Sequence, residues 1–235
     1  MKKIILLFSI SLSVVFSSCY RDLNITDTSR DPQQRPDFEN KREISCQCLF
    51  DLYPVENLSD REREALYFMR EEEKLAMDVY QYLYDKWKHH VFENISNSER
   101  QHMSLILCLI DKYGLEDPSE DLAQGEFRDK NLTEFYDLLI SEGTKSLINA
   151  FIVGATIEDV DIFDLMHYQA NGIDNWDVNA VFQELNKGSR NHMRAFTKNL
   201  KNLGAGYESQ YISSGLLEEI IESERETGDI ICSDT

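Results

Sequence analysis

Apolar side chains recur every three or four residues along four long stretches between about residues 60 and 203. This spacing is typical of helices with one buried face, and the alternation typical of half-buried strands is scarce. The predicted long helices run from about Asp60 to Lys88, Phe92 or Ser96 to Tyr113, Lys145 to Gln169 and Asp177 to Leu203. A short extra helix, Leu132 to Ser141, falls between the second and third. The pattern predicts an all-α, antiparallel bundle of four long helices.

Each apolar stripe is interrupted near its middle by a polar side chain that can bind metal. These side chains are Glu73, the pair Glu99 and His102, Glu158, and His192. In an antiparallel bundle the middles of the helices lie at similar heights, so we expect the five groups to converge. Burying three carboxylates together is costly unless they take up protons or surround cations. Carboxylate and imidazole ligands together suit iron, manganese or zinc.

Other interpretations of this pattern stay open. A single buried Glu or His is more often a hydrogen-bonded core residue than a ligand. Glu71 and Glu72 adjoin Glu73, and either of them can be the inward residue instead. Tyr80 and Trp87 share the helical face of Glu73, which favours Glu73.

Two short motifs resemble the ferritin-like superfamily of di-iron carboxylate bundles. "EKLAMDVY", residues 73–80, is similar to the first helix of ferritins, and "ERQH", residues 99–102, to their second. More narrowly, the chain resembles an uncharacterised prokaryotic ferritin-like family over about residues 60–212. The stretches that carry this likeness are "MREEEKLAMDVY", "FENISNSERQHM", "GATIEDVDIFDL" and "GSRNHMRAF".

The resemblance implies a ferritin-like antiparallel four-helix bundle with iron as its cofactor. In that superfamily two helices each give one Glu and two give Glu-x-x-His. The implied ligands here are Glu73, Glu99, His102, Glu158 and His192. Two iron ions fit the pattern best, with a single ion as the alternative. Manganese and zinc are alternative metals.

One position departs from the di-iron pattern. Ser189 stands where a second bridging Glu is expected. Asp161, one turn from Glu158, can supply the missing carboxylate, or it is an ordinary exposed acid. The resemblance also implies that Tyr80 relays an electron near the metal. Arg194 either orients a ligand carboxylate or is a surface charge.

Three functions follow from these expectations. The first is a di-iron redox protein that reacts with oxygen or peroxide, in the manner of a ferroxidase or a peroxidase. The second is a non-catalytic protein that binds one metal ion. The third is a metal-free bundle that binds a partner in the cell envelope through its acidic loop, residues 115–130, and its acidic tail. The sequence identifies no substrate, reductant or redox partner, and a homodimer is compatible with such bundles.

The first residues have the layout of an export signal. Lys2 and Lys3 precede an apolar run from Ile4 to Phe16 and then small residues before Cys19. "FSSC" resembles a bacterial lipobox, which implies cleavage after residue 18 and a lipid on Cys19. We therefore expect an exported lipoprotein of the cell envelope, tethered to the lipid bilayer by acyl chains. The expected segments are a signal peptide (1–18), a polar tether (19–58), the bundle (59–213) and an acidic tail (214–235).

Four further cysteines bear on the fold. Outside the cytoplasm Cys232 can pair with Cys46 or Cys48, whereas Cys108, inside a predicted helix, is expected to be a packed thiol. The formal net charge of −19 opposes binding to phosphate backbones, so we do not expect a nucleic-acid partner.

Overall fold

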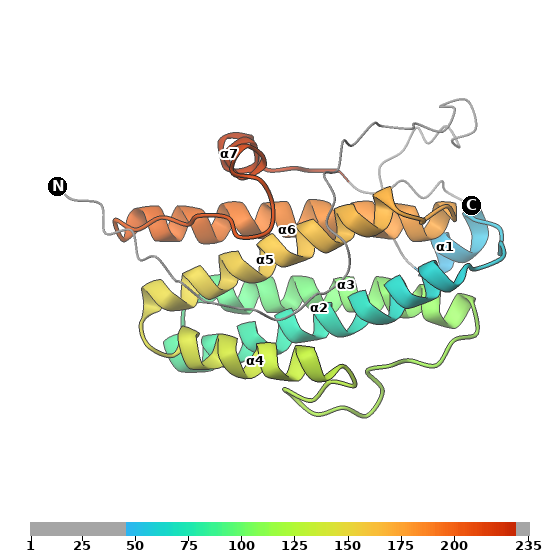
Figure 1. Cartoon of the computed structure of the whole chain (residues 1–235), viewed down its shortest axis with the longest axis horizontal. Coiled ribbons are helices and arrows are strands. Elements are labelled where there is room, and N and C mark those ends of the chain that lie inside the picture. The colour runs from blue at the N-terminus through green and yellow to red at the C-terminus, as the bar shows by residue number, and fades with distance from the viewer. Residues whose placement is uncertain (1–45, 229–235) are drawn as a thin grey trace.

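The computed structural model describes residues 46–228, and within that range it contains seven α-helices and no strands (Figure 1). The all-α prediction is confirmed. The helices are α1 (Cys46–Leu52), α2 (Asp60–Trp87), α3 (His90–Lys112), α4 (Lys130–Gly143), α5 (Leu147–Ala170), α6 (Trp176–Asn202) and α7 (Ser214–Glu222).

The four long helices run side by side (Figure 1). α2 packs along α3, α5 packs along α6, and the two pairs meet where α3 contacts α6 and α2 contacts α5. α4 is the predicted short helix, and it packs on α2 and α5. α3 begins at His90, earlier than predicted, because the His89 side chain accepts a hydrogen bond from the Val91 backbone N–H.

Local sequence signals fix where the helices begin. At the start of α2, Ser59 and Glu62 form a reciprocal capping box. The other oxygen of Glu62 accepts the backbone N–H groups of Asp174 and Asn175, which lie just before α6. The same side chain therefore caps one helix and holds the connection that starts another.

The core consists of two apolar clusters, with the polar middles of the helices between them. On α2, Leu66 and Met69 belong to one cluster and Tyr80 and Leu83 to the other, with Glu73 between. α3 and α6 are divided in the same way. On each of the four long helices the middle of the predicted apolar stripe is buried. Leu203, the last residue of the stripe on α6, is exposed.

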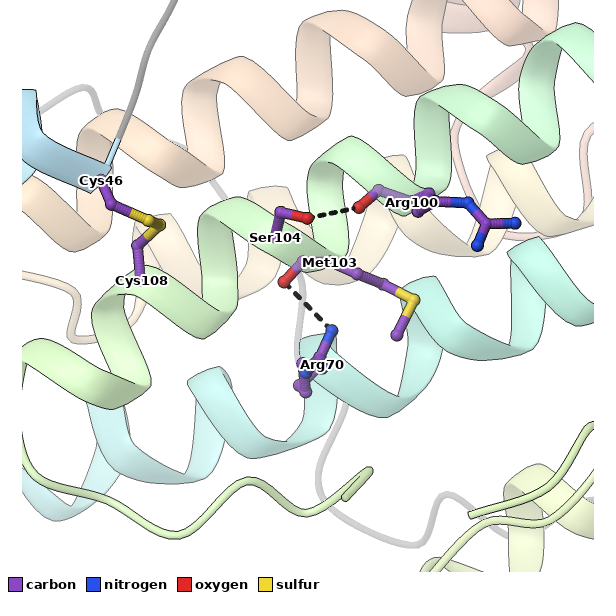
Figure 2. The surroundings of a disulfide bond; sticks show 6 residues. All are labelled: Cys46, Arg70, Arg100, Met103, Ser104 and Cys108. Carbon is purple, nitrogen blue, oxygen red and sulfur yellow. Dashed lines mark hydrogen bonds between the residues drawn. A yellow bond between two sulfur atoms is a disulfide. The ribbon is translucent and has the colours of Figure 1, made fainter. Parts of the chain in front are cut away.

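α1 corrects one prediction about the cysteines. Cys108 is not a free thiol: it forms a disulfide with Cys46, whose Cα lies 5.2 Å away (Figure 2). Cys46 is therefore not available to Cys232, which lies outside the described residues. Cys48 is also disulfide-bonded. α1 lies within the segment expected to be a polar tether.

A buried lysine joins α1 to the long helices. Lys112 Nζ donates to the backbone oxygens of Leu49 and Tyr53 and forms a 2.6 Å ion pair with Asp177 on α6. The charge is satisfied on every side, so it can be buried without a large penalty.

The acidic tail contains α7, which packs on α6. The segment that follows α7 is also bound to α6. The segment before α7 is bound to α5: the buried Asp159 on α5 accepts hydrogen bonds from Tyr207 Oη and from the backbone N–H groups of Gln210 and Ile212.

None of the described helices combines the length and apolarity needed to cross a bilayer. The expected signal peptide and Cys19 lie outside the described residues.

Candidate metal centre

The structure brings together all five side chains that interrupt the apolar stripes. They come from α2, α3, α5 and α6, and the three carboxylates are completely buried. The two imidazoles are nearly so, at 6% exposed for His102 and 8% for His192. The rings of the two histidines stack with their centroids 5.7 Å apart.

The five groups form two triads that share Glu99. In the first, His102 Nδ1 lies 2.7 Å from Glu99 Oε2 and 3.1 Å from Glu73 Oε2. In the second, His192 Nδ1 lies 2.8 Å from Glu99 Oε1 and 3.4 Å from Glu158 Oε2. Within each triad the candidate ligand atoms all lie within 4.8 Å of one another. Each oxygen of Glu99 faces one triad, which is the arrangement of a bridging carboxylate.

Many polar atoms at this centre have no hydrogen-bond partner. Within the described residues nine buried side-chain atoms are unpartnered, and seven of them belong to Glu73, Glu99, Glu158, Asp161 and His192. Buried polar atoms are normally satisfied, so their concentration at one point needs an explanation. The Nδ1 to carboxylate distances are short, but most of these contacts do not have hydrogen-bond geometry. Atoms that converge in this way fit a metal ion, so the donor set passes the chemical test for iron, manganese or zinc.

The protonation of the centre reflects the crowding of its charges. Burial raises the pKa values of Glu73 and Glu158 to about 7. Burial acts in the same direction on Glu99, but the charges of His192 and His102 outweigh it and hold the Glu99 pKa far below its ordinary value. Burial opposes the charged form of His192, yet Glu99 and Glu158 raise its pKa to about 10. Without a cation, the cluster balances its charge with protons.

Asp161 is not an exposed acid. It is 1% exposed, neither carboxylate oxygen has a hydrogen-bond partner, and burial raises its pKa well above the ordinary value. The charge of Glu72 adds most to this shift, followed by those of Glu73 and Glu158, and Asp161 belongs to neither of the two triads. Ser189 is also buried, but its Oγ donates to the Leu185 carbonyl of its own helix.

Tyr80 contacts the same centre. Its hydroxyl donates to Glu158 Oε1 at 2.5 Å, and its ring packs against Phe92 and Phe196. Burial raises the Tyr80 pKa well above the ordinary value, so the phenol keeps its proton. Tyr80 therefore orients Glu158 through a hydrogen bond.

The neighbours of Glu73 have other partners. Glu71 accepts the backbone N–H groups of Arg128 and Asp129 and so closes the connection before α4. Glu72 is hydrogen-bonded to Asp164 of α5. Glu73, the residue that the shared face with Tyr80 favoured, is the one that contacts His102.

Two residues that support the histidines were not among the sequence candidates. Ser98 Oγ lies 3.0 Å from His192 Nε2 and fixes the orientation of that ring. Gly188 packs directly on His102, since a Cβ added there would lie 2.4 Å from His102 Nε2. In the sequence, Ser98 could have been noticed because it is next to Glu99. Nothing in the sequence indicates the role of Gly188, which depends on how α3 packs against α6.

The expectation that Arg194 orients a ligand carboxylate is wrong. Arg194 donates to the Ile220 carbonyl, Ser223 Oγ and Glu226 Oε1, and so binds the C-terminal segment. Arg190 also binds Glu226. The two arginines therefore fasten the C-terminal segment to α6.

A family model described as an uncharacterized protein domain (DUF2202) matches residues 62–224. This chain belongs to that family. It is 48% identical over 175 residues to uncharacterized protein MJ0754 of Methanocaldococcus jannaschii, which covers 74% of this chain and 94% of the relative. The crystal structure of hypothetical protein MJ0754 from Methanococcus jannaschii DSM 2661 superposes with a TM-score of 0.72 at 47% identity. That match covers 74% of this chain and 98% of the solved one. All candidate ligands lie within the residues that the family model matches.

Proposed function

We propose that this DUF2202 domain is a ferritin-like di-iron protein that reacts with peroxide or oxygen. The observation that carries the proposal is the pair of buried triads sharing Glu99, with both oxygens of Glu99 unpartnered by hydrogen bonds. Four long helices that each place a ligand at mid-height correspond to the ferritin-like arrangement. With Asp161 the centre holds four carboxylates, which balance the charge of two divalent cations.

A pair of ferrous ions, when bound, would supply two electrons, which with two protons reduce one hydrogen peroxide molecule to two water molecules. Glu73 and His102 would hold one ion, Glu158 and His192 the other, and Glu99 would bridge them. Tyr80 keeps Glu158 in place through its hydroxyl. We propose that the buried phenol, next to the ligands, also relays an electron.

Metal content tests this proposal directly. The full chain, with Cys19 replaced by Ser to remove the expected acyl anchor, would be loaded with ferrous iron without oxygen and analysed by mass spectrometry. We expect about two ions per chain, as in the ferritin-like di-metal bundles. His102→Ala and His192→Ala should each lose iron. Loaded protein should then consume peroxide in proportion to the iron oxidised.

His90→Ala is the matched control. His90 pairs with Glu93 three residues away, as His102 pairs with Glu99, but its side chain is 82% exposed. This variant should keep its iron. A wild-type protein that binds no iron, manganese or zinc would contradict the proposal and favour a metal-free bundle that binds an envelope partner.

A second candidate is a non-catalytic protein that holds a single ion. Ser189 favours it, because its hydroxyl is bonded to its own helix and no second bridging carboxylate comes from α6. One ion per chain, lost with His102→Ala and retained with His192→Ala, would support this candidate. Absence of peroxide consumption would then be expected.

We also propose that the protein is exported and attached to the envelope membrane through Cys19. The support is the layout of residues 1–19, a charged start, a short apolar run and a lipobox-like cysteine. Labelled palmitate should be incorporated into the wild type and not into Cys19→Ser. The variant should move from the membrane fraction to the soluble one; an unchanged distribution would contradict the proposal.

A further inference from the structure

A cleft of about 580 Å³ opens between α3 and α6 on the side of the two histidines. Its wall on α3 is one helical stripe that includes Ser98, His102 and Ser104. Its wall on α6 includes Gly188 and His192. None of the carboxylates of the centre lines it, so the histidines separate the cleft from Glu73, Glu99 and Glu158.

The histidines present opposite edges to the two sides. Both Nδ1 atoms face the carboxylates, whereas His102 Nε2 faces Gly188 and His192 Nε2 faces Ser98. The space at Gly188 is narrow, because even a methyl group there would lie 2.4 Å from His102 Nε2. The two rings therefore close the inner end of the cleft, and a molecule in the cleft meets them before it meets the carboxylates.

The acidic side chains that line the cleft, Glu184 and Glu226, are paired within the protein. Glu184 pairs with Lys187 on α6, and Glu226 pairs with Arg190 and Arg194. Arg225 and the two histidines also line the cleft, so its walls do not exclude an anion. The amide group of Gln101 lies along the wall and can hydrogen-bond a small polar molecule.

Residues 225–228, which we call the strap, form the outer wall of the cleft. The Glu226 carboxylate accepts hydrogen bonds from Arg190 and Arg194, and its backbone is bonded in both directions to the Asn191 side chain. A second hollow of about 400 Å³ lies along the same part of α6 and shares Glu226 and Gly228. The strap is thus held by polar contacts at Glu226, with hollows beside it.

We propose that this cleft is the substrate site of the centre, that it admits a small polar molecule such as hydrogen peroxide, and that Glu226 latches the strap over it. The inference rests on the proposed function for the chemistry at the metal. The route itself is a property of the cleft and is measurable without metal.

Hydroxyl-radical labelling of the metal-free full chain, read by mass spectrometry, tests the route because the radical is uncharged and similar in size to water. Oxidation of His102 and His192 would be normalised to the exposed His90. Glu226→Ala should raise it several-fold by releasing the strap. Ser104→Trp, which places an indole on the cleft wall, should lower it several-fold.

Two controls match these variants. Glu224→Ala removes an exposed acid next to the strap, and Asn94→Trp adds an indole to α3 about 15 Å from Ser104. Neither should change histidine labelling. Iron content would be measured in every variant and should stay at the wild-type value.

The outcomes separate the two proposals. Histidine labelling that responds to neither Glu226→Ala nor Ser104→Trp overturns the cleft as the route. If labelling responds as expected but the wild type binds no metal, the route stands and the proposed function fails. If the wild type binds iron but labelling does not respond, only the route fails.

Discussion

Single residues at the centre act mainly by leaving room for, or holding, the ligand side chains. Gly188 illustrates the first case, because its missing side chain is what allows His102 to lie between α3 and α6. Tyr80 illustrates the second, because its hydroxyl reaches from α2 to Glu158 on α5. Neither residue needs to touch a metal ion to affect metal binding.

Gly188→Ala should weaken metal binding about tenfold or more, the range seen when support of a ligand is lost. The new methyl group would displace His102 from its position against Glu73 and Glu99. Isothermal titration with Mn²⁺ would measure the affinity. Gly215→Ala, at a helical position with nothing within 4 Å, should leave it unchanged. Equal affinities for wild type and Gly188→Ala would show that His102 is not a ligand in this position.

Tyr80→Phe should destabilise the protein by about 1–3 kcal/mol, because Glu158 loses a buried hydrogen bond while the ring packing remains. Urea unfolding of the metal-free protein would measure the loss. Tyr82, which is 40% exposed, provides the control, and Tyr82→Phe should have almost no effect. A Tyr80→Phe protein as stable as the wild type would mean that the hydroxyl contributes nothing to holding Glu158.

At the scale of elements, short helices at both ends of the domain are fixed to the long ones by specific bonds. α1 is held to α3 by the Cys46–Cys108 disulfide and by Lys112. The strap that follows α7 is held to α6 by Glu226. Short helices are unstable alone, so these bonds, together with apolar packing, give them their order.

Replacing Cys46 and Cys108 together by Ser should lower the free energy of unfolding by about 2–4 kcal/mol, since the disulfide closes a long loop in the unfolded chain. The two cysteines are 62 residues apart. Urea unfolding under non-reducing conditions would measure the change. Iron content should be unaffected, because no ligand comes from α1. A double variant as stable as the wild type would contradict a structural role for this bond.

The ion pairs of Glu226 that bind the strap to α6 should weaken in acid. Hydrogen bonding to Arg190 lowers the Glu226 pKa below its ordinary value of 4.5, and Arg194 adds to this effect. A lowered folded-state pKa means that Glu226 stabilises the strap fully above about pH 4.5 and loses that contribution as the pH falls through the lowered value.

Protection of the amides of residues 223–228 from hydrogen exchange would measure the effect of acid. It should fall in the wild type as the pH drops below about 4.5. In Glu226→Gln it should be low and nearly independent of pH over this range. An identical pH profile in the two proteins would contradict this role of Glu226.

For the whole molecule, the centre couples metal binding to stability, because its carboxylates repel one another unless protons or cations balance them. A cation at one hundred times its dissociation constant should stabilise the native state by about 2.7 kcal/mol per site. For a domain of this size that corresponds to a rise in Tm of about 5–10 °C.

Calorimetry with and without Mn²⁺ would measure the rise, and a chelator should reverse it. The variant carrying both His102→Ala and His192→Ala should show no rise, whereas His90→Ala should respond like the wild type. A rise of equal size in the double variant would place the cation on the acidic surface of the molecule instead.

The sequence by itself determined the helices and the inward residues. The three-to-four spacing of apolar side chains predicted all four long helices and the short α4, because burial requires one apolar face per helix. The same spacing identified Glu73, Glu99, His102, Glu158 and His192 as neighbours in space. The shared face with Tyr80 was enough to prefer Glu73 over Glu71 and Glu72.

Only the tertiary structure decided which groups touch. The pairing of Cys108 with Cys46, the burial of Asp161, the contact of Gly188 with His102 and the binding of the tail by Arg190 and Arg194 all depend on how one element lies against another. Helical periodicity gives the direction of a side chain around its own axis. It contains no information on what the neighbouring helix or a distant segment places opposite that side chain, and this is why the sequence left the surroundings of the candidate centre open.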